Sequence, residues 1–185
     1  AIVDIVTGLN AVISVLSGLL LNNKIKNKNI LTEVNLYNSG IFLLANVASN
    51  TLVSNKDAER YGNGHPNIVP YNLFKSKNGE LAISVGNDNQ FKVFSNLLKK
   101  PEWATDKRFA KNADRVKNRD LIEKLINEEL SKKNRSYWYN LFLKNNIPSA
   151  IVRGVKEALK HPQTQDNDMT AVSYTHLRAH ETSID

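Results

Sequence analysis

The sequence contains no cysteine, which excludes disulfide bonds, zinc–thiolate sites and cysteine nucleophiles from these 185 residues. A chain without thiols is compatible with a reducing compartment, and we expect a cytoplasmic protein. Histidine is also scarce, with four in the chain. His65 and His161 are far apart in the sequence, and the other two lie near the C-terminus, so we predict no metal site.

Several nucleotide-binding and catalytic motifs are missing as well. There is no Gly-x4-Gly-Lys-Ser/Thr phosphate loop and no Gly-x-Ser-x-Gly nucleophile elbow. Residues 62–67 contain two glycines of a dinucleotide fingerprint but lack the third, and they precede an expected strand instead of following one. The sequence therefore gives no sign of a P-loop, a hydrolase elbow or a dinucleotide fold.

The composition is that of a soluble globular protein, with 41% hydrophobic and 23% charged residues. There are 25 basic and 18 acidic residues, for a net charge of +7. Many lysines stand beside asparagine, as in residues 22–29, a pairing that AT-rich codon usage produces. The positive charge is therefore not by itself evidence of nucleic-acid binding.

Both ends of the chain are unusual. Ala1 is preceded by neither methionine nor the charged segment of a signal peptide, and residues 1–3 form an apolar strand-like pattern that we expect to continue upstream. Residues 172–185 have no periodicity, and asparagine and lysine are suddenly absent. This stretch resembles a translated sequencing adapter, so we interpret it as a non-native tail and leave it out of the fold.

Residues 1–21 are rich in apolar side chains but contain Asp4 and several polar residues. A carboxylate is costly inside a membrane-spanning helix, so we expect no membrane insertion. We predict a short strand, then Asp4, then a buried helix over 5–21. Residues 33–37 alternate like a strand, and Asn38-Ser39 is placed to cap a buried helix over 40–52.

A glycine- and proline-rich stretch, residues 62–70, marks a loop and a domain boundary near residue 61. Asn78-Gly79 lies between strand-like segments 69–76 and 80–85, which predicts a β-hairpin with a type I′ turn. The apolar residues of the second strand that share one face are Leu81, Ile83 and Val85.

The remaining sequence is mainly helical. Helices are expected from Asp88 to before Pro101, after an Asn118 cap, and from Ser136, with a helical turn over 155–159 and a short strand over 147–152. The fold class is therefore α/β, with an α+β small domain that is mostly helical and carries a small antiparallel hairpin sheet.

Two further features allow alternative interpretations. The basic run 107–119 could contact phosphate groups, but acidic residues dilute it, so we favour a solvated face with Phe109 in the core. A basic nucleic-acid-binding module stays as an alternative of a different class. Asp4, at an expected helix start, is either an N-cap or a carboxylate nucleophile whose acyl intermediate the helix amides stabilise.

Three segments together, residues 62–71, 85–91 and 108–119, resemble the family III CoA-transferases, also called the CaiB/BaiF family. The resemblance covers about residues 1–169. It implies an enzyme that moves CoA between an acyl-CoA and a (di)carboxylic acid, with coenzyme A as a substrate and no metal. It also implies that Asp4, which lies within the matching segment 3–9, is the nucleophile that forms an aspartyl intermediate.

The resemblance further implies roles for residues around the hairpin. The loop residues Gly62, Asn63, Gly64 and His65 would close over the reacting acyl group. On the first strand, Asn72, Leu73 and Phe74 would contact CoA. The longer glycine run of formyl-CoA transferase is absent, which argues against oxalate or formate as substrates. An α-methylacyl-CoA racemase of the same fold stays as an alternative.

The resemblance also predicts the domain organisation. Residues 1–60 would be the C-terminal part of a large Rossmann-like domain, 61–160 a small domain, 161–171 a stub of the returning linker, and 172–185 the non-native tail. The parent enzyme would form an interlocked homodimer, and this fragment alone would be inactive. We expect acyl-CoA and a small carboxylic acid as partners, and neither nucleic acid nor membrane.

Overall fold

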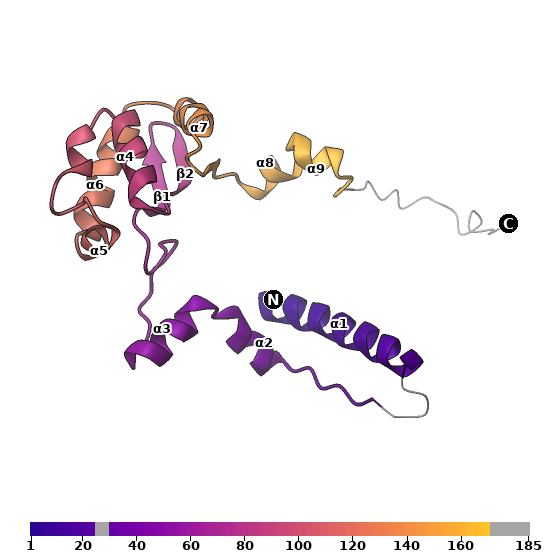
Figure 1. Cartoon of the computed structure of the whole chain (residues 1–185). Coiled ribbons are helices and arrows are strands. Elements are labelled where there is room, and N and C mark those ends of the chain that lie inside the picture. The colour runs from indigo at the N-terminus through magenta and orange to yellow at the C-terminus, as the bar shows by residue number, and fades with distance from the viewer. Residues whose placement is uncertain (25–29, 171–185) are drawn as a thin grey trace. The chain divides into compact units, whose positions relative to one another are not determined.

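The computed structural model describes residues 1–24 and 30–170 of the chain (Figure 1). The fold divides into two compact units, Ala1–Tyr61 and a second that begins at Gly62. The division falls at the glycine- and proline-rich stretch. Residues 172–185, which we interpret as a non-native tail, lie outside the described residues.

The first unit contains the helices α1 (Ile2–Lys24), α2 (Leu36–Leu43) and α3 (Asn46–Ser54). The predicted strand over 1–3 is wrong because α1 already begins at Ile2. The N–H of Ile5 donates to the carbonyl of Ala1 at 3.1 Å, so the helix satisfies its own backbone. An isolated three-residue strand would have no neighbour to pair with.

Helix α1 is exposed on most of its surface, which contradicts the predicted burial. Leu9, Val12 and Leu16 are each more than half exposed, and no part of the window Ile2–Leu21 is buried within the described chain. By length and composition alone, this helix could cross a membrane. Helix α2 packs on one side of it, where Nδ2 of Asn10 lies 3.4 Å from Oγ of Ser39. A helix that is apolar all round becomes buried only in a larger core or in lipid.

The region after α1 also differs from expectation. Residues 33–37 do not form a strand, because Asn35 caps α2 by accepting the N–H of Asn38 at 2.8 Å. The single helix predicted over 40–52 is two helices, α2 and α3, separated at Ala45, which has a φ of 47°. The apolar pattern identified helical sequence here but misplaced its start and missed the break.

The second unit is built on a three-stranded antiparallel sheet of β1 (Tyr71–Ser76), β2 (Gly79–Ser84) and β3 (Ser149–Ile151), in the order β1-β2-β3. The predicted hairpin is confirmed, with Tyr71 opposite Ser84. Its turn is not type I′, because positive φ falls on Gly79 (146°) and not on the two turn residues, Lys77 and Asn78, both of which the structure describes.

The described helices of the second unit surround the hairpin, except for the last two, which extend away from it (Figure 1). They are α4 (Asp88–Leu97), the 3-10 helix η1 (Pro101–Ala104), α5 (Asn112–Lys117), α6 (Arg119–Leu130), α7 (Arg135–Lys144), α8 (Val155–Leu159) and α9 (Pro162–Asp166). The mostly helical fold with a small antiparallel sheet is confirmed. The helices η1, α5 and α9 were not predicted from the sequence.

The core of the second unit forms where α4, α6 and α7 meet the sheet. The shared face of β2 predicted from its alternation is confirmed, and Phe109 lies in the core as expected. The fully buried apolar side chains are Val69, Phe74, Leu81, Val85, Phe91, Phe94, Phe109, Ile122, Ile126, Leu130 and Phe142. This core places the loop before β1 against α5 and α6.

The prediction that the side chain of Asn118 caps α6 is wrong. Asn118 stands at the N-cap position but makes no side-chain cap bond to α6. Its Nδ2 donates instead to the carbonyls of Asp114 at 2.9 Å and Arg108 at 3.3 Å, which closes the C-terminal end of α5. Asn118 therefore links the two helices.

Candidate functional site

The loop over residues 62–70 runs into β1 and is held by hydrogen bonds to its backbone. Gly62 has a φ of 59°, which glycine adopts without strain. The N–H of His65 donates to the carbonyl of Tyr71 at 2.9 Å, and the two rings stack with centroids 5.2 Å apart. Nδ1 of His65 accepts the N–H of Asn67 at 3.1 Å, so the neutral ring carries its proton on Nε2.

Arg115 connects this loop to the core and is itself completely buried. Its Nε donates to the carbonyl of Val69 at 2.6 Å, and its Nη1 to the carbonyl of Phe109 at 2.8 Å. Its Nη2 donates to Oδ1 of Asp88 at 3.0 Å. The guanidinium carbon lies 4.2 Å from the ring centroid of Phe91, a cation–π contact. The buried charge is thus paired and hydrogen-bonded on all sides that the structure describes.

Asp88 and Arg115 shift each other's ionisation. Burial raises the pKa of Asp88, but the hydrogen bond and charge of Arg115, the N–H of Asn112 and the charge of Lys111 outweigh it, so this pKa lies below its ordinary value. Burial lowers the pKa of Arg115, and the carboxylates of Asp88 and Asp114 oppose that shift. Both groups are charged at neutral pH, which strengthens their hydrogen bond.

Asn112, the first residue of α5, joins the loop to the start of α4. Its Oδ1 accepts the N–H of Val69 at 3.1 Å, and its Nδ2 donates to the carbonyl of Asn67 at 2.8 Å. Its backbone N–H donates to Oδ1 of Asp88 at 3.0 Å. One amide side chain therefore holds two polar groups of the loop backbone, one on each side of Ile68.

Arg119, the first residue of α6, holds the middle of the loop. Its Nη2 donates to the carbonyls of His65 at 2.8 Å and Pro66 at 3.0 Å. Its Nη1 lies 3.4 Å from Oε1 of Glu123, whose other oxygen accepts a hydrogen bond from Asn72 of β1 at 3.0 Å. The loop and the first strand are consequently anchored to the same helix.

These contacts bring together the three sequence segments 62–71, 85–91 and 108–119. The basic run was predicted to be a solvated face, and this is wrong for Arg115, which is buried, and for Arg119, which is used inward. A signal was present in the spacing of Asn112, Arg115 and Arg119, since positions i, i+3 and i+7 share one face of a continuous helix. The helix breaks at Asn118, but Asn112, Arg115 and Arg119 all contact the same loop.

The residues expected to contact CoA and the acyl group occupy three environments. Gly62 and Asn63 are exposed, whereas Gly64 and His65 are half-buried. On β1, Asn72 and Leu73 are half-buried. Phe74 is fully buried in the core, and no part of this residue is exposed to a ligand. The structure therefore places the loop side chains, and not Phe74, where a ligand can reach them.

Asp4 lies in the first turn of α1 and is exposed. It is the third residue of the helix and not its N-cap, which corrects the N-cap interpretation. A cavity of about 290 Å³ lies between α1 and α2 in the same unit, lined by residues such as Asn10 and Ser39, and Asp4 is not among them. An exposed carboxylate is accessible to an electrophile such as a thioester carbonyl.

The remaining features concern metal ligands and the division of the predicted site residues between the two units. Among residues 1–24 and 30–170, no group of three or more histidine, aspartate and glutamate side chains is placed to hold a metal ion. Asp4 belongs to the first unit, and the loop 62–70 to the second.

The fold of the chain is similar to that of solved structures. One is a CaiB/BaiF family protein from Brucella suis, which is 32% identical and matches with a TM-score of 0.71. The match covers 95% of this chain and 49% of that chain. The fold is therefore that of CaiB/BaiF proteins.

The sequence comparisons identify the family. The family model described as CoA-transferase family III matches residues 1–182, and the chain belongs to this family. The human succinyl-CoA:glutarate CoA-transferase is 31% identical over 169 residues, covering 91% of this chain and 38% of that protein. The acetyl-CoA:oxalate CoA-transferase of Acetobacter aceti is 30% identical over 137 residues, covering 74% of this chain and 35% of that protein. The chain thus spans less than half the length of these relatives.

Proposed function

We propose that this chain is part of a longer cytoplasmic enzyme that transfers CoA from an acyl-CoA to a small carboxylic acid. The observation that carries the proposal is the meeting of three family segments at one fixed loop through Asn112, Arg115 and Arg119. Relatives that act on succinyl-CoA with glutarate and on acetyl-CoA with oxalate support a dicarboxylic acid as acceptor. The absence of a longer glycine run favours acceptors other than oxalate.

In the proposed reaction, the carboxylate of Asp4 attacks the thioester carbonyl of the donor. A mixed anhydride forms and CoA leaves as a thiolate. The thiolate then attacks the aspartyl carbonyl, which releases the donor carboxylate and leaves an aspartyl-CoA thioester. The acceptor carboxylate attacks this thioester, forms a second anhydride and frees the thiolate, which takes the acceptor acyl group and restores the Asp4 carboxylate.

In this proposal, the loop 62–70 positions the reacting acyl group and excludes water from it. Gly62 and Asn63 are exposed, whereas the residues that follow are tied to α5 and α6. One end of the loop can therefore approach a ligand closely while the other end stays fixed. A mixed anhydride hydrolyses in water, so a backbone segment that covers it raises the yield of transfer over hydrolysis.

We also propose that the active form is a homodimer and that the 185 residues are inactive alone. The chain spans 38% of the human relative, and its α1 exposes apolar side chains that a complete large domain would cover. An assay of the 185-residue chain beside the complete protein, with light scattering on both, tests this. Equal activity of the two forms would contradict it.

The test of the function uses the complete protein, succinyl-CoA and a panel of mono- and dicarboxylic acids. Transfer should give a new acyl-CoA, and hydroxylamine should trap an acyl-aspartate at Asp4. Asp4→Asn should reduce transfer by at least about a thousandfold, as expected when a covalent nucleophile is lost. Asp57→Asn, another exposed aspartate of the same unit, is the matched control and should leave transfer unchanged.

A racemase of the same fold predicts a different result. It would exchange the α-proton of a 2-methylacyl-CoA with solvent and would form no acyl-aspartate. Proton exchange without CoA transfer in this assay would replace the proposed function with that one.

A further inference from the structure

A groove at the ends of α4 and α6 and the start of α7 has no role in the proposed reaction. It consists of two adjoining pockets of about 350 and 380 Å³. Their shared lining residues are Lys132, Lys133 and Tyr137. None of the residues assigned to the acyl or CoA site lines either pocket.

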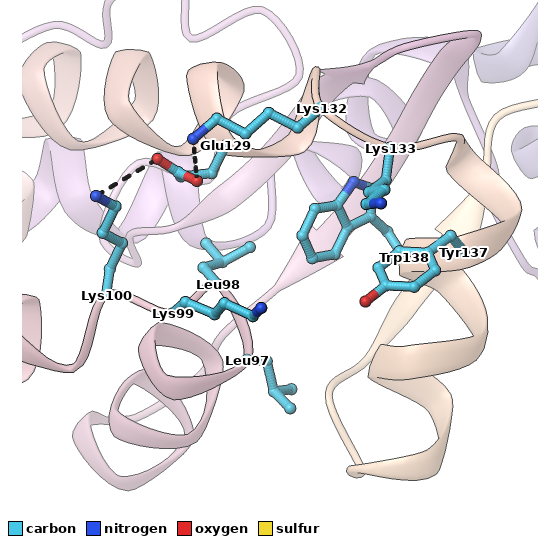
Figure 2. Close-up of a pocket in the computed structure, with 9 residues that line it drawn as sticks. All are labelled: Leu97, Leu98, Lys99, Lys100, Glu129, Lys132, Lys133, Tyr137 and Trp138. Carbon is cyan, nitrogen blue, oxygen red and sulfur yellow. Dashed lines mark hydrogen bonds and ion pairs between the residues drawn. The ribbon is translucent and has the colours of Figure 1, made fainter.

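The first pocket has an apolar and aromatic floor. It lies between the end of α4, the end of α6 and the start of α7 (Figure 2). Leu98 and Trp138 are 2% and 6% exposed and form its base, whereas the ring of Tyr137 is 49% exposed. The indole N–H of Trp138 is already used in a 2.8 Å hydrogen bond to the carbonyl of Leu130, so this side chain is fixed. Tyr137 is therefore the aromatic side chain of this pocket against which a flat ring can stack.

The rim of the groove is strongly basic. The two pockets together are lined by one glutamate, Glu129, and five lysines, Lys77, Lys99, Lys100, Lys132 and Lys133. Glu129 is already neutralised, because its oxygens lie 3.6 Å from Nζ of Lys100 and 2.6 Å from Nζ of Lys132. Figure 2 shows this carboxylate between the two ammonium groups, at one edge of the pocket.

Three of the lysines make no ion pair within the described part of the chain. They are Lys77, Lys99 and Lys133. The ammonium of Lys133 lies 5.7 Å from the ring centroid of Tyr137, and that of Lys99 extends into the space between α4 and α7 (Figure 2). The backbone N–H of Lys77 donates to the carbonyl of Lys133 at 3.0 Å, so the hairpin turn and the α6–α7 connection carry their lysines side by side.

We propose that this groove binds a free nucleotide. Its planar base lies on the floor formed by Leu98, Tyr137 and Trp138, and its phosphate groups lie among the unpaired lysines. The ligand must combine an apolar flat part with a multiply charged anionic part, because the two halves of the groove have these complementary characters. The pocket volumes are within the range of small-molecule sites, and stacking of a base on an aromatic ring is worth about 1–3 kcal/mol.

The test is calorimetric titration of the full chain with ATP, ADP, adenosine and inorganic triphosphate at fixed ionic strength. We expect saturable binding of the nucleotides, with adenosine and triphosphate each at least about tenfold weaker, since each carries half of the recognition. The double variant Lys99→Gln/Lys133→Gln should weaken ATP binding about tenfold or more, because two charge-assisted contacts are lost. Tyr137→Ala should weaken ATP and leave triphosphate unchanged.

The matched control is Lys92→Gln/Lys144→Gln, which removes the same charge from exposed positions of α4 and α7 outside the groove. Its nucleotide affinity should stay within about twofold of the parent chain, because only long-range screened charge is lost. Circular dichroism of each variant verifies folding. Since none of these residues belongs to the proposed transfer reaction, the outcome is independent of that function.

Four results would overturn the proposal. They are the absence of saturable nucleotide binding, triphosphate binding as tight as ATP, equal losses in the groove and control variants, and unchanged ATP affinity in Tyr137→Ala. Coenzyme A carries the same adenosine phosphate and is titrated in parallel. If coenzyme A alone binds and responds to the groove variant, the groove belongs to substrate binding and the free-nucleotide proposal is wrong.

Discussion

Nη2 of Arg115 lies 3.0 Å from Oδ1 of Asp88, and this contact joins α5 to the first turn of α4. Arg115 is completely buried, whereas the Asp88 side chain is 38% exposed. The pair therefore connects the core to the surface directly beneath the loop 62–70. Because Arg115 also holds the carbonyl of Val69, the stability of the unit and the position of the loop depend on one guanidinium.

Replacing Arg115 with methionine should lower the free energy of unfolding by about 3 kcal/mol, since one buried charge partner and two carbonyl contacts are lost. Urea unfolding at pH 7 measures this. Arg108→Met is the control, because Arg108 pairs with Asp106 at an exposed site and its loss should leave the free energy of unfolding nearly unchanged. Equal losses in the two variants would contradict the anchoring role.

The pair also predicts an acid-sensitive stability. The pKa of Asp88 is lowered in the folded chain, so its contribution is present at neutral pH and is lost as the pH falls below its unfolded value of about 3.9. Asp88→Asn should be less stable than the parent at pH 7, and the difference should shrink below about pH 4. Unfolding curves from pH 7 to acid measure it, with Glu128→Gln, an exposed change on α6, as the control. A difference that is constant with pH would contradict the ion-pair assignment.

Arg119→Gln should loosen the loop without unfolding the unit. It removes the donor to the carbonyls of His65 and Pro66, while the core beneath stays intact. Amide hydrogen exchange at Val69 should become about tenfold faster, which corresponds to about 1.4 kcal/mol of lost protection. Lys117→Gln, an exposed change on α5, should leave that exchange unchanged. Unaltered exchange in Arg119→Gln would show that the remaining anchors suffice.

Gly79→Ala should destabilise the hairpin by about 1–2 kcal/mol, because φ is 146° there, a conformation that L-residues rarely adopt. A Cβ at this position would also lie 3.1 Å from Cδ of Arg135. Gly154→Ala is the control, since its Cβ would have open space and its φ is −68°. Thermal unfolding of both variants measures this. A loss of stability in Gly79→Ala no larger than that in Gly154→Ala would argue against strain at the turn.

Local signals predicted most of the second unit. The Asn78-Gly79 pair indicated the hairpin, and the alternation of Leu81, Ile83 and Val85 indicated its buried face, because turn chemistry and strand periodicity act over a few residues. The turn type was mistaken, since positive φ falls on Gly79 and Asn78 instead accepts the N–H of Arg135 from α7. Asn78 and Arg135 are far apart in the sequence, so their contact leaves no signal in either local segment.

The first unit was predicted less well for a related reason. Apolar residues in α1 indicated a helix, but its start at Ile2 and its exposure depend on which neighbours are present. The strand expected over 33–37 had suitable alternation and no partner strand. The start of α2 is fixed by Asn35, whose side chain accepts the N–H of Asn38, whereas the sequence predicted that Asn38-Ser39 would cap the helix.

The amino-acid sequence by itself determined most of the helical and hairpin segments of residues 62–170. The three segments that resemble the CoA-transferases indicated the family. Tertiary structure alone decided that Arg115 and Arg119 turn inward to hold the loop, when their neighbours in the basic run face water. Periodicity is a property of consecutive residues, whereas the pairing of a buried charge depends on groups that only the folded chain brings within hydrogen-bond distance.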